Sequence, residues 1–320
     1  MNVLERLSEA VAELLREDLR RVLLGEDVRD GGMLGLSRGA MQDAALRLRV
    51  LGTPLTPAAA LAHATGLALA GRRPIVLLAS ATALLEGYAA LRELGRVSAT
   101  AQGERSAPVL IVAPTGPGFG LGGDGAESPG AALTAVPGLR VLELGDAGEA
   151  VAMLRAAASF DDSEAPTLLL LPRALVLRDM MPEDFKDGLG RPLGAARVVR
   201  EGAAATVYAI GAAVDQTFAA VEQTGLDVGI VEVSGLAPLD EAGIVAAART
   251  GKLVVTHAGG RTQGPGAELV ALLADQAILH LDAPVLRVGG ADGPLTGKGE
   301  DAGLPSVEAI AAAITKVATY

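Results

Sequence analysis

Short apolar runs, each bounded by glycine, proline or a charged residue, recur through the first half of the chain. They are RVLLG at 21–25, PIVLLAS at 74–80, PVLIVAP at 108–114, LRVLEL at 139–144 and TLLLL at 167–171. Because most of them do not alternate apolar with polar residues, they are typical of strands buried on both faces of a parallel sheet. Ala- and Leu-rich stretches between them predict helices at 38–50, 57–70, 81–94 and 147–158. Alternating strands and helices predict an α/β fold, a sheet flanked by helices.

A charged stretch that contains proline and glycine, with little periodicity, interrupts this pattern at 179–192, and we interpret it as a linker. A second α/β unit follows it, with strands expected at 205–211, 227–233, 252–258 and 283–290 and helices at 212–224, 240–249, 266–277 and 306–315. The pattern therefore predicts two domains, a larger one at 1–178 and a smaller one at 193–320.

The first residues predict an amphipathic helix and not a signal peptide, because apolar side chains recur there near helical spacing: Leu4, Leu7, Val11, Leu14, Leu15 and Val22. This stripe, together with the small residues of the helices at 57–70 and 212–220, would suit a dimer interface. The apolar runs are far shorter than the roughly 20 residues of a membrane span. We therefore expect a soluble, cytoplasmic protein without a membrane partner.

Composition narrows the function classes further. The chain has 320 residues, a net charge of -11, no Trp, 3 Tyr and 4 Phe, and no block of Lys and Arg, so we expect no nucleic-acid partner. It has no cysteine, which excludes disulfides and thiolate catalysis. The histidines His63, His257 and His280 form no ligand-like cluster, so no metal site is predicted.

Three other features stand near expected strand ends. His257 ends a strand, where α/β sheets bind ligands, although a structural role is the simpler interpretation. The glycine-rich run at 116–125 lacks the Lys-Ser/Thr of a phosphate-binding loop, so we interpret it as a flexible loop. Glu26 and Asp27 follow the first strand directly, and although adjacent acids commonly form a solvated turn, its position at the sheet edge makes Glu26 a candidate for chemistry.

Motifs in the same order along nearly the whole chain resemble the beta subunit of thiamine-diphosphate-dependent 2-oxo acid dehydrogenases. The segments that carry the resemblance include GEDVRDGG at 25–32, GTPLT at 52–56, ALAGRRPIV at 68–76, PGLRVL at 137–142, LAPLD at 236–240 and TGKLVVTH at 250–257. The resemblance implies a transketolase-like fold, with a pyrimidine-binding domain and a smaller C-terminal domain. It also implies a coenzyme site shared with an alpha-type subunit, which would hold the diphosphate and its magnesium.

The family's pocket residues are altered in this sequence. The family pattern D-T-P-l-t-E has a glutamate that activates the coenzyme, and Pro57 stands at that position. The pocket aromatic falls on Ser80, and the histidine of H-S-Q-S-x-E falls on Gly125, with Gly130 at the closing glutamate. Ala113 stands where the family has an arginine. Proline is favoured in the first turn of a helix, and Thr56 could cap that helix, but neither residue supplies a carboxylate.

These substitutions leave three hypotheses. The first is a structural or regulatory beta-type subunit with a vestigial pocket, which binds no cofactor alone and pairs with an alpha-type subunit as a heterotetramer, or with itself as a homodimer, and possibly with the acyltransferase core. The second is an active subunit for thiamine-dependent oxidative decarboxylation, in which Glu26 replaces the lost acid. The third is a metabolite-binding module that reuses the emptied pocket around Ala79, Ser80 and Gly125.

Overall fold

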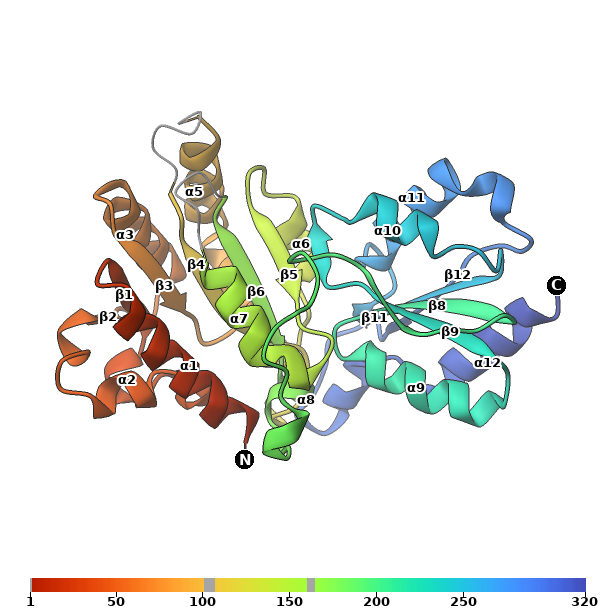
Figure 1. Cartoon of the computed structure of the whole chain (residues 1–320), viewed down its shortest axis with the longest axis horizontal. Helices are drawn as coiled ribbons and strands as arrows, with labels where there is room; N and C mark the ends of the chain where they lie inside the picture. The colour runs from red at the N-terminus through yellow and green to blue at the C-terminus, as the bar shows by residue number, and fades with distance from the viewer. Residues whose placement is uncertain (1, 101–106, 160–164) are drawn as a thin grey trace.

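Two sheets lie side by side, each between layers of helices (Figure 1). The computed structural model describes residues 2–100, 107–159 and 165–320. The first sheet has seven strands in the order β10-β5-β6-β4-β3-β1-β2, and the second has five in the order β12-β11-β8-β9-β7. The predicted α/β fold with a parallel-dominated sheet and a second, smaller sheet is confirmed.

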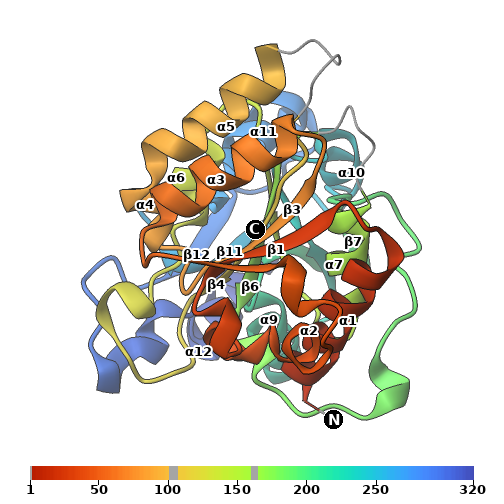
Figure 2. The same cartoon turned by 90° about the vertical axis from the view of Figure 1, so that its left-hand side faces the viewer.

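The first sheet is parallel except at β10, and its apolar strands are buried on both faces, as their composition predicts. Its strands are β1 (Arg21–Glu26), β2 (Val50–Thr53), β3 (Arg73–Leu77), β4 (Leu110–Thr115), β5 (Arg140–Glu143), β6 (Thr167–Pro172) and β10 (Gly235–Ala237). Figure 2 shows helices α3 (Pro57–Leu69) and α5 (Tyr88–Thr100) on one face, and α1 (Val3–Glu17), α2 (Arg38–Gln42) and α7 (Ala150–Ala158) on the other. Short helices α4 (Ala83–Glu86), α6 (Gly130–Thr134) and α8 (Arg173–Val176) follow strands or connect elements.

The second sheet is parallel except at its edge strand β7, which runs antiparallel to β9. Its strands are β7 (Arg197–Arg200), β8 (Ala205–Ile210), β9 (Val228–Glu232), β11 (Leu253–Gly260) and β12 (Leu286–Gly290). Helices α9 (Ala213–Thr224) and α12 (Val307–Ala318) cover one face, and α10 (Glu241–Ala246) and α11 (Gly266–Gln276) cover the other (Figure 1).

Three predicted helices differ from the structure, and two short strands were not predicted. The helix expected at 38–50 ends at Gln42, and the chain then forms β2, because the sequence VLGT pairs with β1. The helix expected at 81–94 is two helices separated at Gly87, and the helix expected at 147–158 begins with a 3-10 turn before Ala150. Strands β7 and β10 were not predicted, since antiparallel pairing at a sheet edge leaves little pattern in such short segments.

The apolar stripe of helix α1 packs inside the core of its own chain. Val3, Leu7, Val11 and Leu15 are buried in a core with residues of α7 and β1. An Asn2 capping box begins the helix, and its side chain accepts a hydrogen bond from Leu4 N (2.8 Å). Because this stripe is already covered, it does not provide the dimer interface that the sequence suggested, and Val22, which we counted with it, lies in β1.

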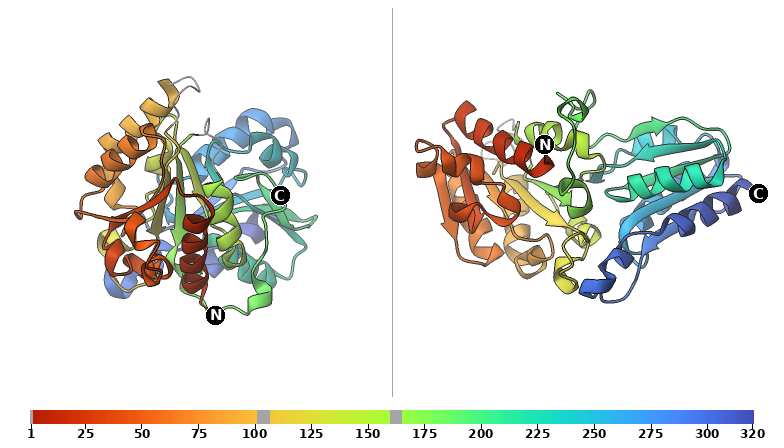
Figure 3. Two further views of the ribbon diagram at one scale, coloured as in Figure 1. Left: turned by 60° about the vertical axis from the view of Figure 1, so that its left-hand side comes forward. Right: turned by 90° about the horizontal axis from the view of Figure 1, so that it is seen from below.

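The two sheets are joined by more than a linker. Strand β10 lies beyond residue 193 in sequence but pairs with β5 of the first sheet, and one apolar cluster contains residues of both halves. The view from below in Figure 3 shows the N-terminus near the junction of the two lobes and the C-terminus at the far end of the second lobe. Within the described ranges, no helix has the length and apolar character to cross a membrane.

Candidate functional site

The carboxyl ends of β1, β3, β4 and β6 meet at one edge of the first sheet, where parallel α/β sheets bind ligands. Glu26 ends β1 there and is buried, and its Oε2 accepts a hydrogen bond from Ala79 N (3.0 Å) in the segment after β3. Burial raises the pKa of the Glu26 carboxyl, the Ala79 N–H opposes this shift, and the charges of Asp27 and Glu86 add to it. The structure therefore places the retained acid at the expected edge, held by backbone.

Pro57 is the first residue of α3 and is buried. The helix has no side-chain cap, so Thr56 does not make the hydrogen bond that the sequence suggested. The start of α3 packs closely on the junction of α4 and α5, because a Cβ built on Gly87 would lie 3.0 Å from Pro57 Cβ. Pro57 thus has a clear packing role and brings no ionisable group to this edge.

The other altered positions lie in the segments that follow β3 and β4, or in β4 itself. Ser80 Oγ accepts a hydrogen bond from Thr82 N (3.3 Å), and Ala113 is fully buried inside β4. Gly125 lies in a 3-10 turn against Leu121, and Gly130 begins α6, packed near Leu236. None of these five positions, Pro57 included, carries a group that can exchange a proton at neutral pH or stack on an aromatic ring.

An arginine that the sequence did not single out lies at the centre of this edge. Arg173 follows β6 and is 1% exposed, and its guanidinium donates hydrogen bonds to Gly116 O (3.0 Å) and Ala79 O (3.4 Å). The guanidinium also lies over the ring of Phe119, 5.6 Å from its centroid. Arg173 therefore connects the segment that holds Glu26 to the glycine-rich loop.

The glycine-rich loop at 116–125 is held by a carboxylate from the second half of the chain. Glu300, in the 3-10 segment Gly297–Gly303, accepts hydrogen bonds from Gly118 N (2.7 Å), Gly120 N (2.7 Å) and Gly122 N (3.1 Å). Gly122 has φ of 61°, and a Cβ there would lie 2.3 Å from Gly297 N, so only glycine permits this approach. The loop expected from the sequence is thus tied to the second half of the chain, because the N–H groups of alternate residues form an anion nest that Glu300 fills.

Replacing Glu300 by alanine should lower the free energy of unfolding by about 2–4 kcal/mol, because three N–H groups lose a charged acceptor. Burial raises the pKa of Glu300, but the loop N–H groups outweigh it and hold the pKa below its ordinary value. A carboxyl whose pKa is lowered in the folded state stabilises the fold above its unfolded pKa, and this contribution is lost as pH falls through the folded pKa. Denaturant unfolding from pH 7 to pH 3 measures both effects.

The control for this prediction is Asp301→Ala, an exposed neighbour for which a change within about 0.5 kcal/mol is expected. Glu300→Gln keeps one acceptor oxygen without the charge, so its stability should show less of the acid-linked decline. Equal losses in Glu300→Ala and Asp301→Ala would show that the nest contributes nothing to stability.

The histidines do not converge on this edge. His257 is fully buried in β11, where Nδ1 lies 2.8 Å from Ala258 O, and its ring fills the space above Gly264 and Gly266. Burial lowers its pKa, so the ring is neutral at pH 7. His63 and His280 are exposed at other places, and among the described residues no cluster of acids and histidines could hold a metal ion.

Comparison with known proteins shows the family of the chain that carries this edge. Residues 1–178 match the family model of the transketolase pyrimidine binding domain, and residues 194–310 match that of the transketolase C-terminal domain. The 2-oxoisovalerate dehydrogenase subunit beta of Pseudomonas aeruginosa is 32% identical over 99% of this chain and 95% of that protein. The chain belongs to the family of 2-oxo acid dehydrogenase beta subunits. The pyruvate dehydrogenase E1 component subunit beta of Acholeplasma laidlawii, 29% identical over 99% of this chain and 98% of that protein, is a further relative.

Solved structures share the fold of this beta-type subunit. A split gene transketolase, described as an inactive beta4 tetramer, superposes with a TM-score of 0.71 at 21% identity, over 100% of this chain and 98% of that one. Transketolase from Leishmania mexicana superposes with a TM-score of 0.68 at 18% identity, over 98% of this chain and 45% of that one. The family depends on thiamine diphosphate. The residues at the edge around Glu26 and Pro57 therefore determine whether this chain can use the coenzyme.

Proposed function

We propose that this beta-type subunit no longer activates thiamine diphosphate and acts as a structural or regulatory subunit of a dehydrogenase-like assembly. The observation that carries the proposal is Pro57, a buried proline in the first turn of α3 at the position where the family motif has its activating glutamate. A positioned acid or base contributes about 10²–10⁴ to a rate. Without it, the proposed role is assembly with an alpha-type subunit.

The residues at the sheet edge do not fit the coenzyme's aminopyrimidine. The remaining acid, Glu26, already accepts a hydrogen bond from Ala79 N, and the positions of the pocket aromatic and histidine are Ser80 and Gly125. A carboxylate that must meet a ring nitrogen has to be within hydrogen-bond reach and oriented toward it. We therefore route no catalytic step through thiamine diphosphate in this chain.

Contacts within the chain also close the edge. Arg173 joins the Ala79 segment to the glycine-rich loop, and Glu300 ties that loop to the second lobe. In the family motif H-S-Q-S-x-E, the histidine that works on substrate stands at the position of Gly125 in this loop. A loop whose N–H groups are already engaged is suited to keep one conformation, which supports a structural role.

Exposed apolar side chains at the same edge support a protein partner. Met33 follows β1, Leu55 follows β2, Leu85 follows β3, and Phe119 and Leu121 follow β4, and each is at least 38% exposed. The carboxyl ends of parallel neighbouring strands share one edge, so we infer that these side chains lie toward this end of the first sheet's lobe. Apolar groups gathered in this way mark protein interfaces. An alpha-type subunit is the partner that the relatives' heterotetramers suggest, and a second copy of this chain is the alternative.

Charged substitutions on this face test whether it is the interface for assembly. Leu55→Asp combined with Leu121→Asp should weaken association with the alpha-type subunit at least about tenfold, because a buried unpaired charge is costly at an interface. Leu279→Asp is the matched control, since Leu279 is 94% exposed and lies in the other lobe. Sedimentation equilibrium measures both. Equal association of the two variants would argue against this face as the interface.

One observation favours the active-subunit alternative. Glu26 is buried at the right edge, and burial raises its pKa above the ordinary value, which is the direction of shift found for carboxyls that act as catalytic acids and bases. If Glu26 replaces the lost acid, Glu26→Gln abolishes a turnover that the unmodified chain shows with its alpha-type partner. Unchanged turnover in Glu26→Gln eliminates that role.

A further inference from the structure

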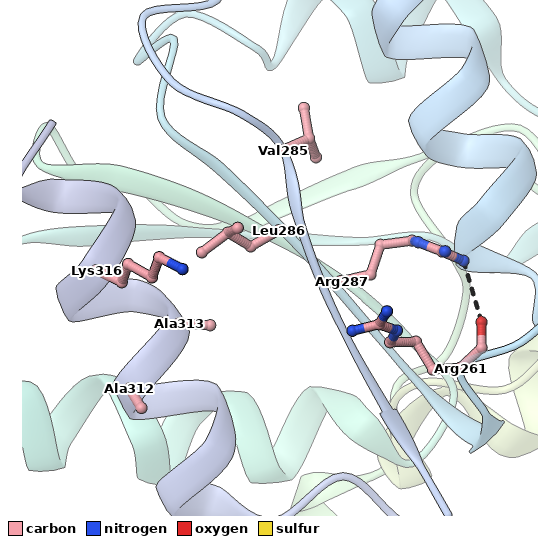
Figure 4. A pocket seen from close by; sticks show the side chains of 7 residues that line it. All are labelled: Arg261, Val285, Leu286, Arg287, Ala312, Ala313 and Lys316. Atoms are coloured by element: carbon pink, nitrogen blue, oxygen red, sulfur yellow. Dashed lines mark hydrogen bonds between the residues drawn. The ribbon is translucent and has the colours of Figure 1, made fainter. Parts of the chain in front are cut away.

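A cavity of about 370 Å³ lies at the open edge of the second sheet, and its lining residues all belong to the second lobe. It is bounded by edge strand β12, by helix α12 and by the end of β11, and its lining residues are Arg261, Val285, Leu286, Arg287, Ala312, Ala313 and Lys316 (Figure 4). Its size lies within the range of small-molecule sites, roughly 300–1,000 Å³. The small side chains of Ala312 and Ala313 leave space between the helix and the strand.

The charges in this cavity are all positive. Arg261, Arg287 and Lys316 line it together with four apolar residues, and no carboxylate does. Within the described part of the chain, none of the three makes an ion pair, although acidic residues outnumber basic ones by 38 to 27. Three unpaired cations around one hollow, in an acidic protein, produce a local positive potential that attracts an anion.

Asp292, an acid whose charge interacts with Arg261, is engaged elsewhere. Asp292 accepts hydrogen bonds from Thr262 N (2.8 Å) and Thr262 Oγ1 (3.0 Å), so both of its oxygens are engaged by the neighbour of Arg261. These Thr262 bonds are the main reason that the pKa of Asp292 is lowered, and the charge of Arg261 contributes less. The guanidinium of Arg261 thus keeps its donors available.

The backbone around Arg261 is fixed. Arg287 Nη1 donates a hydrogen bond to Arg261 O (3.0 Å), and a Cβ on Gly289 would lie 2.9 Å from Arg261 Cα, so only glycine allows β12 to pass this closely. In Figure 4 the side chain of Lys316 extends from α12 toward β12, and the guanidinium of Arg261 turns back toward the same strand. Arg287 thereby holds the segment from which Arg261 reaches the cavity.

We propose that this Arg261–Lys316 cavity binds a small organic phosphate. Arg261 and Lys316 contact the phosphate oxygens, since a guanidinium and an ammonium are the donors that phosphate prefers. Val285, Leu286, Ala312 and Ala313 contact the organic body, because ligand sites combine apolar walls with few placed polar groups. Arg287 positions Arg261 and adds positive charge. The site is independent of the coenzyme edge and of any alpha-type partner.

Calorimetric titration of the full chain, without a partner, with ADP, inorganic pyrophosphate and adenosine tests the proposal. ADP should bind saturably at one site, pyrophosphate more weakly because it lacks the organic body, and adenosine not at all. Affinity should fall as salt is raised, because exposed charges are screened. Arg261→Ala and Lys316→Ala should each weaken ADP binding at least fivefold, which is about 1 kcal/mol by the tenfold constant of 1.4.

The matched control is Arg92→Ala, an exposed arginine of α5 in the other lobe, which should leave ADP affinity unchanged. Circular dichroism confirms that each variant is folded. No saturable ADP binding at about 10 mM, equal losses in Arg92→Ala and Lys316→Ala, or adenosine binding as tightly as ADP would each overturn the proposal.

Discussion

Replacing Arg197 by methionine is expected to lower the free energy of unfolding by about 3–5 kcal/mol, because it leaves the buried Glu232 with only the more distant Arg191 and removes one cation from the buried Glu149. Arg197 Nη1 lies 2.6 Å from Glu149 Oε1, and Arg197 Nε donates to Glu232 Oε2 (2.9 Å). The Glu149 and Glu232 side chains are 3% and 1% exposed. Chemical denaturation at pH 7 measures the loss.

Arg197 has a large expected effect on stability because its ion-pair network includes residues of both lobes and of the linker. Glu149 lies before α7 in the first lobe, Arg191 and Lys186 lie in the linker, and Arg197 and Glu232 lie in the second lobe. Arg191 alone remains near both buried glutamates when Arg197 is removed, at 2.7 Å from Glu149 and 3.8 Å from Glu232. Loss of Arg197 therefore weakens the contact between the lobes.

The pH dependence of this variant has a definite sign. Burial raises the pKa of Glu232, and Arg197 and Arg191 oppose that shift, so removing Arg197 raises the pKa further. A carboxyl whose folded pKa lies above its unfolded pKa binds more protons in the native state, so its stabilising contribution is lost as pH rises. Arg197→Met should thus be more destabilised at pH 8 than at pH 5.

Arg200→Met is the control on the same strand. The charged groups of Arg200 and Asp227 lie 3.9 Å apart, and both side chains are exposed. We therefore expect this substitution to lower the free energy of unfolding by no more than about 1 kcal/mol. Losses of equal size in Arg197→Met and Arg200→Met would show that the buried network does not hold the lobes together.

The second large effect concerns turnover. The chain assembled with its alpha-type partner and thiamine diphosphate is expected to decarboxylate 2-oxo acids at least about 10²–10⁴-fold more slowly than the same partner with a beta subunit that has the motif glutamate. The physical reason is Pro57, which offers no proton-exchanging group. Steady-state decarboxylation by the two assemblies, at equal concentration, measures the ratio. Comparable rates would contradict the loss of function.

Much of the fold could be predicted from sequence because burial on both faces leaves an unmistakable pattern. The runs that became β1, β4 and β6 are continuous and apolar, and each is buried along its whole length. Strand β10 could not be predicted, because its three residues form a strand only by pairing with β5, nearly a hundred residues earlier. The break at Gly87 was missed for a similar reason: it is set by packing against Pro57.

The sequence predicted where the candidate site lies, but not all of the contacts that form it. A motif placed Glu26 at the sheet edge, and the structure puts it there. The contact of Glu300 with the glycine-rich loop spans about 180 residues, and nothing local distinguishes Glu300 among the chain's acids. One signal was available: glycines at every second position from 116 to 122 can present successive N–H groups, and such a nest requires an anion.

The central claim is that this chain no longer supplies the carboxylate that activates the coenzyme. Its most direct test is hydrogen–deuterium exchange at the thiazolium C2 of thiamine diphosphate, followed by NMR in the assembly with the alpha-type partner. We expect exchange at the rate of the free coenzyme, with acceleration appearing when Pro57 is replaced by glutamate. Accelerated exchange with the unmodified chain, abolished by Glu26→Gln, would contradict it.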